Sequence, residues 1–468
     1  MKIEQIYTGC LAQGAYYIES NGEVAIIDPM REVSEYIDLA NSRGAKIKYI
    51  FETHFHADFV SGHLTLSERT GAPIIFGPTA TTSFDSITAV DNQEFKLGDV
   101  TIKVLHTPGH TMESTCYLLI DESGKEHSLF SGDTLFLGDV GRPDLAVKSD
   151  LTAEDLAGHL FDSLRTKIMT LADDVIVYPG HGAGSACGKN ISIDLVGSIG
   201  NQKENNYALR SDMTKEEFVK EVTEGILPPP AYFPLNVGLN RDGYKDADKV
   251  LSEGKNPLKP TEFEITAENT EAIILDVRHQ DEFAKGHIPN SIFIGINGGF
   301  APWVGALIKD VNQAILLVCH DDQLDETIKR LSRVGFDTVI GYLEGGFSAW
   351  KSENKEVATV ETISSDDFST LLAKEDLHVM DVRKESEYIS EHVISAKNTP
   401  LDYLNQFMGE FSKEKTNYVH CAGGYRSMIA NSILKARGIH NLVDVQGGFG
   451  AIKTTTAPVS EFVCPSTL

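Results

Sequence analysis

The amino-acid sequence predicts an α/β protein built from three successive domains. Short strand-like and helix-like segments alternate through the first half of the chain, which favours layered α/β architecture. A segment rich in Pro, Asn and Gly at residues 225–260 interrupts this pattern. The remainder contains an internal repeat. At 468 residues the chain is also too long for a single hydrophobic core.

The first domain is expected to span residues 1–245. Its strand-like segments end near Gly, Pro, Asp or His, as strands do when their ends present polar groups. These segments cover residues 14–18, 24–28, 47–52, 101–106, 116–120 and 128–131, with helix-like stretches at 31–42 and 153–171. The run Pro228-Pro229-Pro230 belongs to the segment that we expect to end the domain.

Two tandem copies of one smaller domain are expected after that segment. The run Leu275-Asp276-Val277-Arg278 recurs as Met380-Asp381-Val382-Arg383, a displacement of 105 residues, the difference between 276 and 381. Gly345-Gly346-Phe347 recurs as Gly447-Gly448-Phe449. The repeat therefore predicts one α/β domain at residues 255–355 and a second at residues 360–460.

Composition narrows the classes of partner and location. A formal charge of −27 repels phosphate backbones and anionic lipid surfaces, so we expect neither a nucleic acid nor a membrane as partner. The N-terminus opens directly into strand-like sequence without the features of a signal peptide. Six scattered cysteines without a CxxC pair favour a reduced, cytoplasmic setting.

Four motifs in the first domain place histidines and aspartates at the ends of strand-like segments. They are Thr53-His54-Phe55-His56-Ala57-Asp58, Pro108-Gly109-His110, Ser131-Gly132-Asp133 and Pro179-Gly180-His181. Loops of this kind project imidazoles and carboxylates into one cleft from a rigid sheet. The four motifs together therefore predict a metal site.

In this order the motifs resemble the metallo-β-lactamase superfamily, across residues 1–245, and the resemblance implies an αββα sandwich. In that family an HxHxDH run, a later His, an Asp and a final His hold two metals. Here Phe59 stands where the two-zinc hydrolases carry a histidine. The persulfide dioxygenases of the superfamily use a smaller ligand set. By that resemblance one Fe(II) per chain is held by His54, His110 and Asp133, with Zn as an adventitious or alternative metal.

The same resemblance gives expectations for the neighbouring residues. His56, Asp58 and His181 are expected to support the ligands or to remain from a second metal site, and His63 to be structural or helix-capping. Arg142 is expected to pair with a carboxylate of the substrate's thiol carrier, with a structural arginine as the equal alternative. Cys187 lies near the iron as a sulfur acceptor or is a buried, inert thiol.

Two imidazoles and one carboxylate suit iron chemistry. Such a triad leaves three coordination positions open on ferrous iron, so a persulfide sulfur and O₂ can bind side by side. Zinc has no accessible redox states and cannot do this.

The last domain carries a cysteine loop, His420-Cys421-Ala422-Gly423-Gly424-Tyr425-Arg426-Ser427, between a strand-like and a helix-like segment. It resembles the CxxGxRS loop of rhodaneses, the sulfurtransferases. Backbone N–H groups and a helix N-terminus around Cys421 would stabilise a thiolate and a bound persulfide. Cys421 and Arg426 are therefore the expected catalytic residues. The substrate is expected to bind at Gly423, Gly424, Tyr425 and Ser427.

The middle domain keeps the scaffold but not the loop chemistry. Its loop, Cys319-His320-Asp321-Asp322, is acidic and lacks the Gly and Arg of the last domain. Nearby carboxylates raise a thiol pKa and repel an anionic sulfur donor. We therefore expect an inactive rhodanese-like spacer, with a residual role for Cys319 as the alternative.

The whole chain resembles the persulfide dioxygenase–rhodanese fusion proteins of bacterial sulfide detoxification. The resemblance implies that O₂ oxidises a low-molecular-weight thiol persulfide to sulfite, and that a Cys421 persulfide links this step to thiosulfate. Family analogy also implies a homo-oligomer. Two alternatives stay open: a two-zinc thioester hydrolase like glyoxalase II, and a non-catalytic sulfur-carrier protein.

Overall fold

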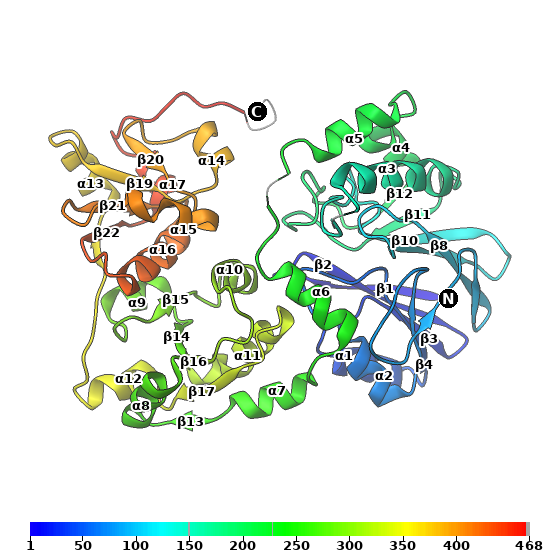
Figure 1. The fold of residues 1–468 in the computed structure, drawn as a ribbon, viewed down its shortest axis with the longest axis horizontal. Coiled ribbons are helices and arrows are strands. Elements are labelled where there is room, and N and C mark those ends of the chain that lie inside the picture. Colours follow the sequence, from blue (N-terminus) through cyan, green and yellow to red (C-terminus); the bar gives the residue numbers. More distant parts are fainter. Residues whose placement is uncertain (148–149, 227, 465–468) are drawn as a thin grey trace. The chain divides into compact units, whose positions relative to one another are not determined.

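The computed structural model describes residues 1–147, 150–226 and 228–464 (Figure 1). Leu227, inside the predicted boundary segment, lies outside the described residues. The chain divides into two units, one made of Met1–Lys249 with Leu331–Phe336 and the other of Val250–Arg330 with Asp337–Leu468.

Two six-stranded sheets form the first unit. The first sheet has the order β1 (Lys2–Thr8), β2 (Gln13–Ser20), β3 (Glu23–Ile27), β4 (Lys46–Phe51), β5 (Ile74–Phe76) and β6 (Ile87–Thr88). The second has the order β12 (Gly197–Ser198), β11 (Ile176–Pro179), β10 (Glu126–Gly132), β9 (Thr115–Ile120), β8 (Val100–His106) and β7 (Glu94–Leu97).

The two sheets pack face to face around an aromatic core. Tyr16 and Phe51 of the first sheet share this core with Tyr117 and Phe130 of the second. The ring centroids of Phe51 and Tyr117 are 4.7 Å apart, and those of Tyr16 and Phe130 are 5.0 Å apart. Such large apolar side chains contribute the greatest share of burial energy in a sandwich.

Helices cover the outer faces of both sheets (Figure 1). α1 (Ser34–Ser42) and α2 (His63–Thr70) pack on the first sheet. A second core joins strands β8 to β11 with α3 (Ala153–Ser163), α4 (Ile199–Asn205) and α5 (Lys215–Thr223). The predicted αββα sandwich is thus confirmed. α6 (Phe233–Asp242) and α7 (Ala247–Gly254) follow it.

Two expected helices differ in their bounds. The helix expected at 31–42 begins only at Ser34, and Val33 at its N-cap forms no side-chain capping hydrogen bond. The helix expected at 153–171 begins with a capping box between Thr152 and Asp155 and ends as an α-helix at Ser163. It continues as a single π-helical turn, Leu164–Ile168.

The second unit contains two five-stranded parallel sheets with the same strand order. The middle domain has β13 (Pro257–Leu258), β17 (Val339–Leu343), β16 (Ile315–Val318), β14 (Ile273–Asp276) and β15 (Ile292–Phe293). The last domain has β18 (Glu361–Ile363), β22 (Leu442–Val445), β21 (Asn417–His420), β19 (His378–Asp381) and β20 (Ala396–Asn398). β14 and β19 begin and end 105 residues apart, the displacement of the sequence repeat.

Helices follow these strands in the same pattern in both copies. The middle domain has α8 (Pro260–Thr270), α9 (Gln280–Lys285), α10 (Phe300–Leu307), α11 (Leu324–Arg333) and α12 (Gly346–Ser352). The last domain has α13 (Ser365–Leu372), α14 (Glu385–Ser390), α15 (Leu404–Phe407), α16 (Tyr425–Ala436) and α17 (Gly448–Ile452). The expected fold class, one sandwich followed by two rhodanese-like domains, is confirmed.

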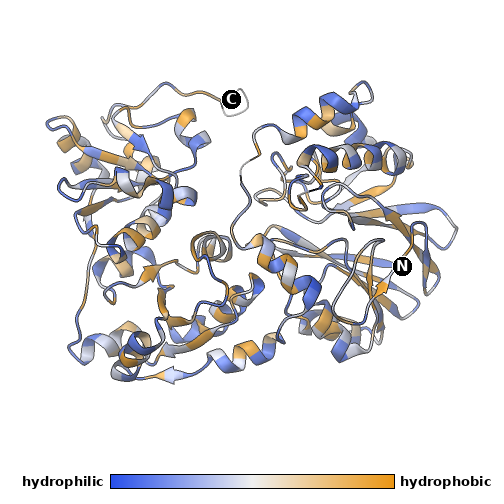
Figure 2. Cartoon of the chain, viewed as in Figure 1, coloured by the Kyte–Doolittle hydropathy of each residue, from blue (hydrophilic) through white to orange (hydrophobic). Residues whose placement is uncertain are grey.

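Hydropathy explains which strands lie inside each layer. All four residues of β16, Ile-Leu-Leu-Val, are buried, as parallel strands are when helices cover both faces. β7 alternates exposed and buried residues, as expected of an edge strand with one face in water. In Figure 2 the central strands accordingly carry much of the hydrophobic colour.

Among the described residues, no helix combines the length and the apolar character that crossing a membrane requires.

Candidate functional site

Three loops at the ends of β4, β8 and β10 bring His54, His110 and Asp133 together. All three residues are buried, and their ligand atoms lie within 4.8 Å of one another. The distance from Asp133 Oδ2 is 3.5 Å to His110 Nε2 and 3.9 Å to His54 Nε2. The structure therefore groups the three residues that the sequence analysis assigned to the metal.

Hydrogen bonding gives the His110 ring a defined tautomer. Its Nδ1 lies 2.8 Å from the backbone carbonyl oxygen of Arg142, which can only accept, so Nδ1 carries a proton and the neutral ring presents its lone pair at Nε2. Within the described part of the chain, neither His110 Nε2 nor Asp133 Oδ2 has a hydrogen-bond partner. Two buried acceptors 3.5 Å apart repel each other unless a cation lies between them. A metal ion fits this arrangement.

The His54 ring is oriented in a similar way. The Thr53 hydroxyl donates to Asp28 Oδ2 at 2.8 Å, so it accepts from His54 Nδ1 at 3.0 Å. This leaves His54 Nε2 with its lone pair on the side of Asp133. Burial and the neighbouring His56 hold the pKa of His54 well below its usual range, which keeps the imidazole in the neutral form that binds metals.

His56 is engaged elsewhere. Its Nε2 lies 3.1 Å from Asp28 Oδ1 and 3.3 Å from Glu52 Oε2, and these three residues form a separate buried group. Burial opposes the charged imidazole, but the two carboxylates outweigh it and raise the pKa of His56 well above its usual range. The ring of Phe59 packs against the His56 ring with a centroid distance of 4.3 Å. A metal ion bound at His56 would have to displace that proton.

Asp58, His181 and Cys187 form a third buried group with ligand atoms within 4.8 Å. His181 bridges two carboxylates, with Nδ1 2.9 Å from Asp133 Oδ1 and Nε2 2.8 Å from Asp58 Oδ2. Although burial disfavours its charge, Asp133 and Asp58 raise the pKa of His181 to about 10. A second metal at this position would have to displace that proton.

Cys187 is both close to the centre and buried, so the structure combines the two alternatives given for it. Its side chain is 1% exposed. Burial, then Asp58 and Asp133, raise the pKa of the thiol well above its usual range. Without a bound cation the thiol therefore stays protonated and a weak nucleophile.

Arg142 lies beside the site but its guanidinium is occupied. Nε and Nη2 donate to the two carboxylate oxygens of Asp144 at 2.6 and 2.7 Å, and Nη1 donates to the Ala186 carbonyl at 3.2 Å. This is the geometry of a loop-stabilising arginine, the alternative to carrier binding. Its carbonyl oxygen also orients His110.

His63 is structural rather than helix-capping. It is the first residue of α2, and the N-cap position belongs to Gly62. Its fully buried ring packs against Phe76, Phe84 and Tyr244. Of the two alternatives for His63, helix capping is therefore wrong. A capping side chain belongs to the residue before the helix, and His63 lies inside it.

The Cys421 loop connects β21 to α16. The buried Sγ of Cys421 accepts a hydrogen bond from the Gly424 backbone N–H at 3.1 Å, and Gly424 adopts a φ of 101° at the N-cap of α16. A side chain at Gly424 would be strained in this left-handed conformation. Ser427 donates to the Gly424 carbonyl at 3.2 Å, which fixes the turn. A Cβ atom added at Gly423 would have no neighbour within 4 Å, so the space above the loop is open at this position.

Arg426 forms a bidentate pair with a carboxylate. Its Nη1 and Nη2 donate to Glu387 at 2.6 and 2.8 Å. The positive charge of Arg426, an expected catalytic residue, is therefore paired with Glu387, which the sequence analysis did not assign to the site. Glu387 follows the recurring Asp-Val-Arg run, and this position is its only sequence signal.

The middle domain places Cys319 at the end of β16, as the last domain places Cys421 at the end of β21. Burial, Asp321 and Asp276 raise the pKa of Cys319 to about 12. The electrostatics therefore agree with the expectation of a poor nucleophile in this loop.

Asp28, Glu52 and Thr53 were not among the expected site residues. Glu52 and Thr53 directly precede His54, and Asp28 ends a strand-like segment, so each carried a weak signal as a polar group at a strand end. Their role depends on β3 and β4 lying side by side, which local sequence does not show.

Comparisons with known proteins identify two kinds of domain in the chain. The sequence pattern of the Metallo-beta-lactamase superfamily matches residues 8–181, and that of the Rhodanese-like domain matches residues 259–353 and 364–455. The hydroxyacylglutathione hydrolase of Rhizobium etli is 38% identical over 164 residues, which cover 34% of this chain. The chain spans 57% of the length of that curated relative.

Two solved structures are similar as well. A metallo-beta-lactamase from Staphylococcus aureus subsp. aureus COL is 30% identical with a TM-score of 0.64, over 73% of this chain and 98% of that one. ETHE1 from Myxococcus xanthus is 27% identical with a TM-score of 0.44, over 52% of this chain and 98% of that one.

Proposed function

Because this chain belongs to the metallo-β-lactamase superfamily and carries two rhodanese-like domains, we propose that it is an iron-dependent persulfide dioxygenase fused to a sulfurtransferase. The substrates are a low-molecular-weight thiol persulfide and O₂. The products are sulfite and, through Cys421, thiosulfate.

The observation that carries the proposal is that His56 pairs with Asp28 and Glu52 and is not grouped with His54, His110 and Asp133. His54, His110 and Asp133 offer two imidazoles and one carboxylate in a buried cluster, while Asp28 and Glu52 hold His56. A hydrolytic zinc site of this superfamily uses that histidine as a further ligand. The remaining set is the facial triad of non-haem iron oxygenases.

An iron(II) ion held by these residues would supply redox chemistry and a place for both substrates. The chain's own residues set the environment: Thr53 and the Arg142 carbonyl orient the two imidazoles. Burial of the cluster excludes bulk water. In the balanced reaction, persulfide, O₂ and water give thiol, sulfite and two protons, so the terminal sulfur is oxidised and O₂ is reduced.

The last domain would consume the sulfite. Sulfite attacks the outer sulfur of a Cys421 persulfide, the S–S bond to Cys421 breaks, and the electron pair leaves on the cysteine thiolate. A new S–S bond forms in thiosulfate, and no net oxidation occurs. The Gly424 N–H that contacts Cys421 Sγ is placed to stabilise the leaving thiolate.

A second candidate function is a metal-dependent thioester hydrolase. The hydroxyacylglutathione hydrolases among the relatives favour it, as does the buried group of Asp58, His181 and Cys187. That group could hold a second metal if the His181 proton were displaced. Phe59 and the occupied His56 favour the dioxygenase instead.

Metal analysis combined with oxygen uptake tests the proposal. Protein purified anaerobically is expected to contain about one iron per chain and to consume O₂ with glutathione persulfide. Stoichiometric zinc without iron, with hydrolysis of lactoylglutathione, would establish the hydrolase. A full iron complement without O₂ uptake would indicate a sulfur-carrier protein.

The two activities should be separable by mutation. Cys421→Ala is expected to abolish thiosulfate formation and to leave sulfite production unchanged, since the loop does not contribute to the metal centre. Cys464→Ala, at an exposed cysteine, serves as the matched control. Thiosulfate formed at the normal rate by Cys421→Ala would refute the role of this cysteine.

A further inference from the structure

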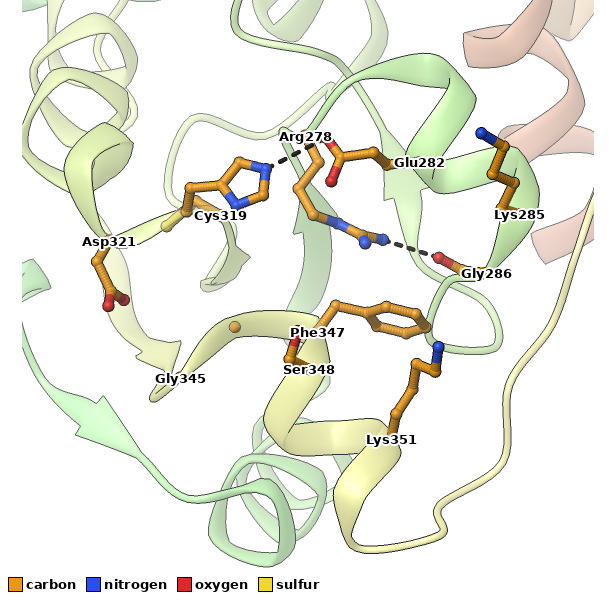
Figure 3. A pocket seen from close by; sticks show the side chains of 12 residues that line it. Arg278, Glu282, Lys285, Gly286, Cys319, Asp321, Gly345, Phe347, Ser348 and Lys351 are labelled. Atoms are coloured by element: carbon orange, nitrogen blue, oxygen red, sulfur yellow. Dashed lines mark hydrogen bonds and ion pairs between the residues drawn. The ribbon is translucent and has the colours of Figure 1, made fainter.

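The middle domain contains a cavity of about 340 Å³ beside Cys319. Figure 3 shows Arg278 and Phe347 at its centre, Lys285 and Lys351 on one side, and Cys319 and Asp321 on the other. Cavities of this size lie at the lower end of small-molecule sites. The question is whether this one is only the remnant of a sulfur-transfer pocket.

An arginine contact in the floor of the pocket recurs in the last domain. Arg278 pairs with Asp276 at 2.5 Å and lies over the Phe347 ring at 4.3 Å. In the last domain Arg383 pairs with Asp381 at 2.6 Å and lies over the corresponding phenylalanine ring at 4.0 Å. These contacts are therefore retained in both copies.

The charges around the thiol differ between the two domains. In the last domain the guanidinium of Arg426 pairs with Glu387. In the middle domain the equivalent of Glu387 is Glu282, and its partner is the His320 ring at 3.2 Å. Leu324 occupies the position of Arg426, so the loop itself no longer offers a strong cation.

Positive charge has instead been gained on the opposite wall. In the last domain Lys453 lies 3.8 Å from Glu391. The equivalent pair in the middle domain is Lys351 and Gly286, so the lysine has lost its carboxylate. Lys285 adds a further cation nearby.

Neither Lys285 nor Lys351 forms an ion pair or a side-chain hydrogen bond with any residue that the structure describes. Both are on the rim of the pocket, which leaves their ammonium groups available to a ligand.

We propose that this pocket is a binding site for a small organic anion, held by Lys285 and Lys351 and lying along the Phe347 ring. The Asp321 carboxylate on the opposite side orients the ligand, since it repels the acidic group toward the lysines. The Cys319 thiol closes the floor as a neutral group, so it does not repel an anion. Binding here involves no sulfur transfer and is independent of the function proposed above.

Lysine footprinting on the full-length protein tests the site. The protein is treated with a limiting acetylating reagent at rising concentrations of N-acetyl-S-methylglutathione, a carboxylate probe without a free thiol or a free amine, and separately of thiosulfate. Peptide mass spectrometry then follows each lysine. Protection of Lys285 and Lys351 together, with no change at Lys453, is the expected result.

The arms of the experiment identify the anion. Protection by N-acetyl-S-methylglutathione supports the organic carboxylate ligand, whereas protection by thiosulfate alone would show a site for an inorganic oxyanion and overturn the proposal. Lys351→Met should weaken the protection of Lys285 at least tenfold, whereas the control Lys453→Met should not alter it. Absence of protection by N-acetyl-S-methylglutathione up to about 10 mM, or equal protection of Lys453, would also overturn the proposal.

Discussion

The phenol of Tyr425 donates a hydrogen bond of 2.7 Å to the backbone carbonyl oxygen of Gly295. Tyr425 opens the helix that follows the Cys421 loop, whereas Gly295 belongs to the loop after β15 of the middle domain. The Tyr425 ring also packs edge-on against Phe293, with a centroid distance of 5.9 Å. The middle domain thus helps to fix the helix on which the sulfur-carrying loop depends.

Removing the Tyr425 hydroxyl should therefore slow sulfur transfer. Tyr425→Phe loses one hydrogen bond worth about 1 kcal/mol, and we expect a several-fold lower kcat for thiosulfate formation with O₂ uptake unchanged. Gly298→Ala should have a larger effect, because the added methyl group would overlap the Tyr425 ring. Steady-state kinetics of thiosulfate formation measure both.

The matched control is Tyr418→Phe in β21. Among the described residues the Tyr418 hydroxyl has no hydrogen-bond partner, so this variant loses an oxygen without losing a contact. A kcat for Tyr425→Phe equal to that of Tyr418→Phe would contradict the positioning role.

The strand ends and the presence of a metal site could be predicted because they depend on local patterns. Strand-like alternation located β4, β8 and β10, and polar residues at their ends indicated a metal site. The choice of His54, His110 and Asp133 among those residues came from the family resemblance. The contacts of His56 could not be predicted in this way. They require Asp28 on a neighbouring strand, and no spacing in the sequence reports that two carboxylates meet one imidazole.

The position of Cys187 is a similar case. It lies in an irregular loop after β11, and only the folded chain brings it within reach of Asp58 and His181. The contact between Tyr425 and Gly295 joins two domains and was equally hidden. Motifs identify groups that carry chemistry, whereas their partners are determined by packing.

Restoring the imidazole at position 59 should change the metal content. Phe59→His offers a ligand beside Asp58 and His181, so we expect the variant to bind up to two zinc ions per chain when zinc is supplied. Because Phe59 is fully buried, the change should also cost about 1–3 kcal/mol of stability. Metal analysis and thermal unfolding measure the two effects.

Phe59→Leu controls for the loss of packing, since it removes the ring without adding a ligand. It should be destabilised to a similar degree and should show no gain in zinc. An unchanged metal content in folded Phe59→His would argue that the charged His181, rather than Phe59, blocks the second position.

Asp444 should make the stability of the last domain depend on pH. Burial raises the pKa of this carboxyl to about 7, so the folded state binds a proton that the unfolded state has released above about pH 4. The contribution of this group to the free energy of unfolding is therefore greatest below about pH 4 and decreases as the pH rises toward 7. Asp444→Asn should remove that decline and stabilise the protein at pH 8.

Denaturant unfolding at pH 5 and pH 8 measures the difference. Asp366→Asn, an exposed aspartate in α13, is the matched control and should leave the slope with pH unchanged. If Asp444→Asn shows the same loss of stability between pH 5 and pH 8 as the unsubstituted protein, the buried carboxyl is not responsible.

The acidic loop of the middle domain predicts how its cysteine reacts. Because burial and the loop carboxylates raise the pKa of Cys319 to about 12, less than about one thiol in a thousand is ionised at pH 8. Its alkylation rate should therefore rise about tenfold per pH unit from pH 8 to pH 10. Asp321→Asn should lower the pKa and increase the rate at pH 8, whereas Asp325→Asn, which removes the partner of Lys255, should not. Mass spectrometry of the Cys319 peptide after timed iodoacetamide treatment measures these rates. A rate that is independent of pH would show that access to the thiol, not its ionisation, limits the reaction.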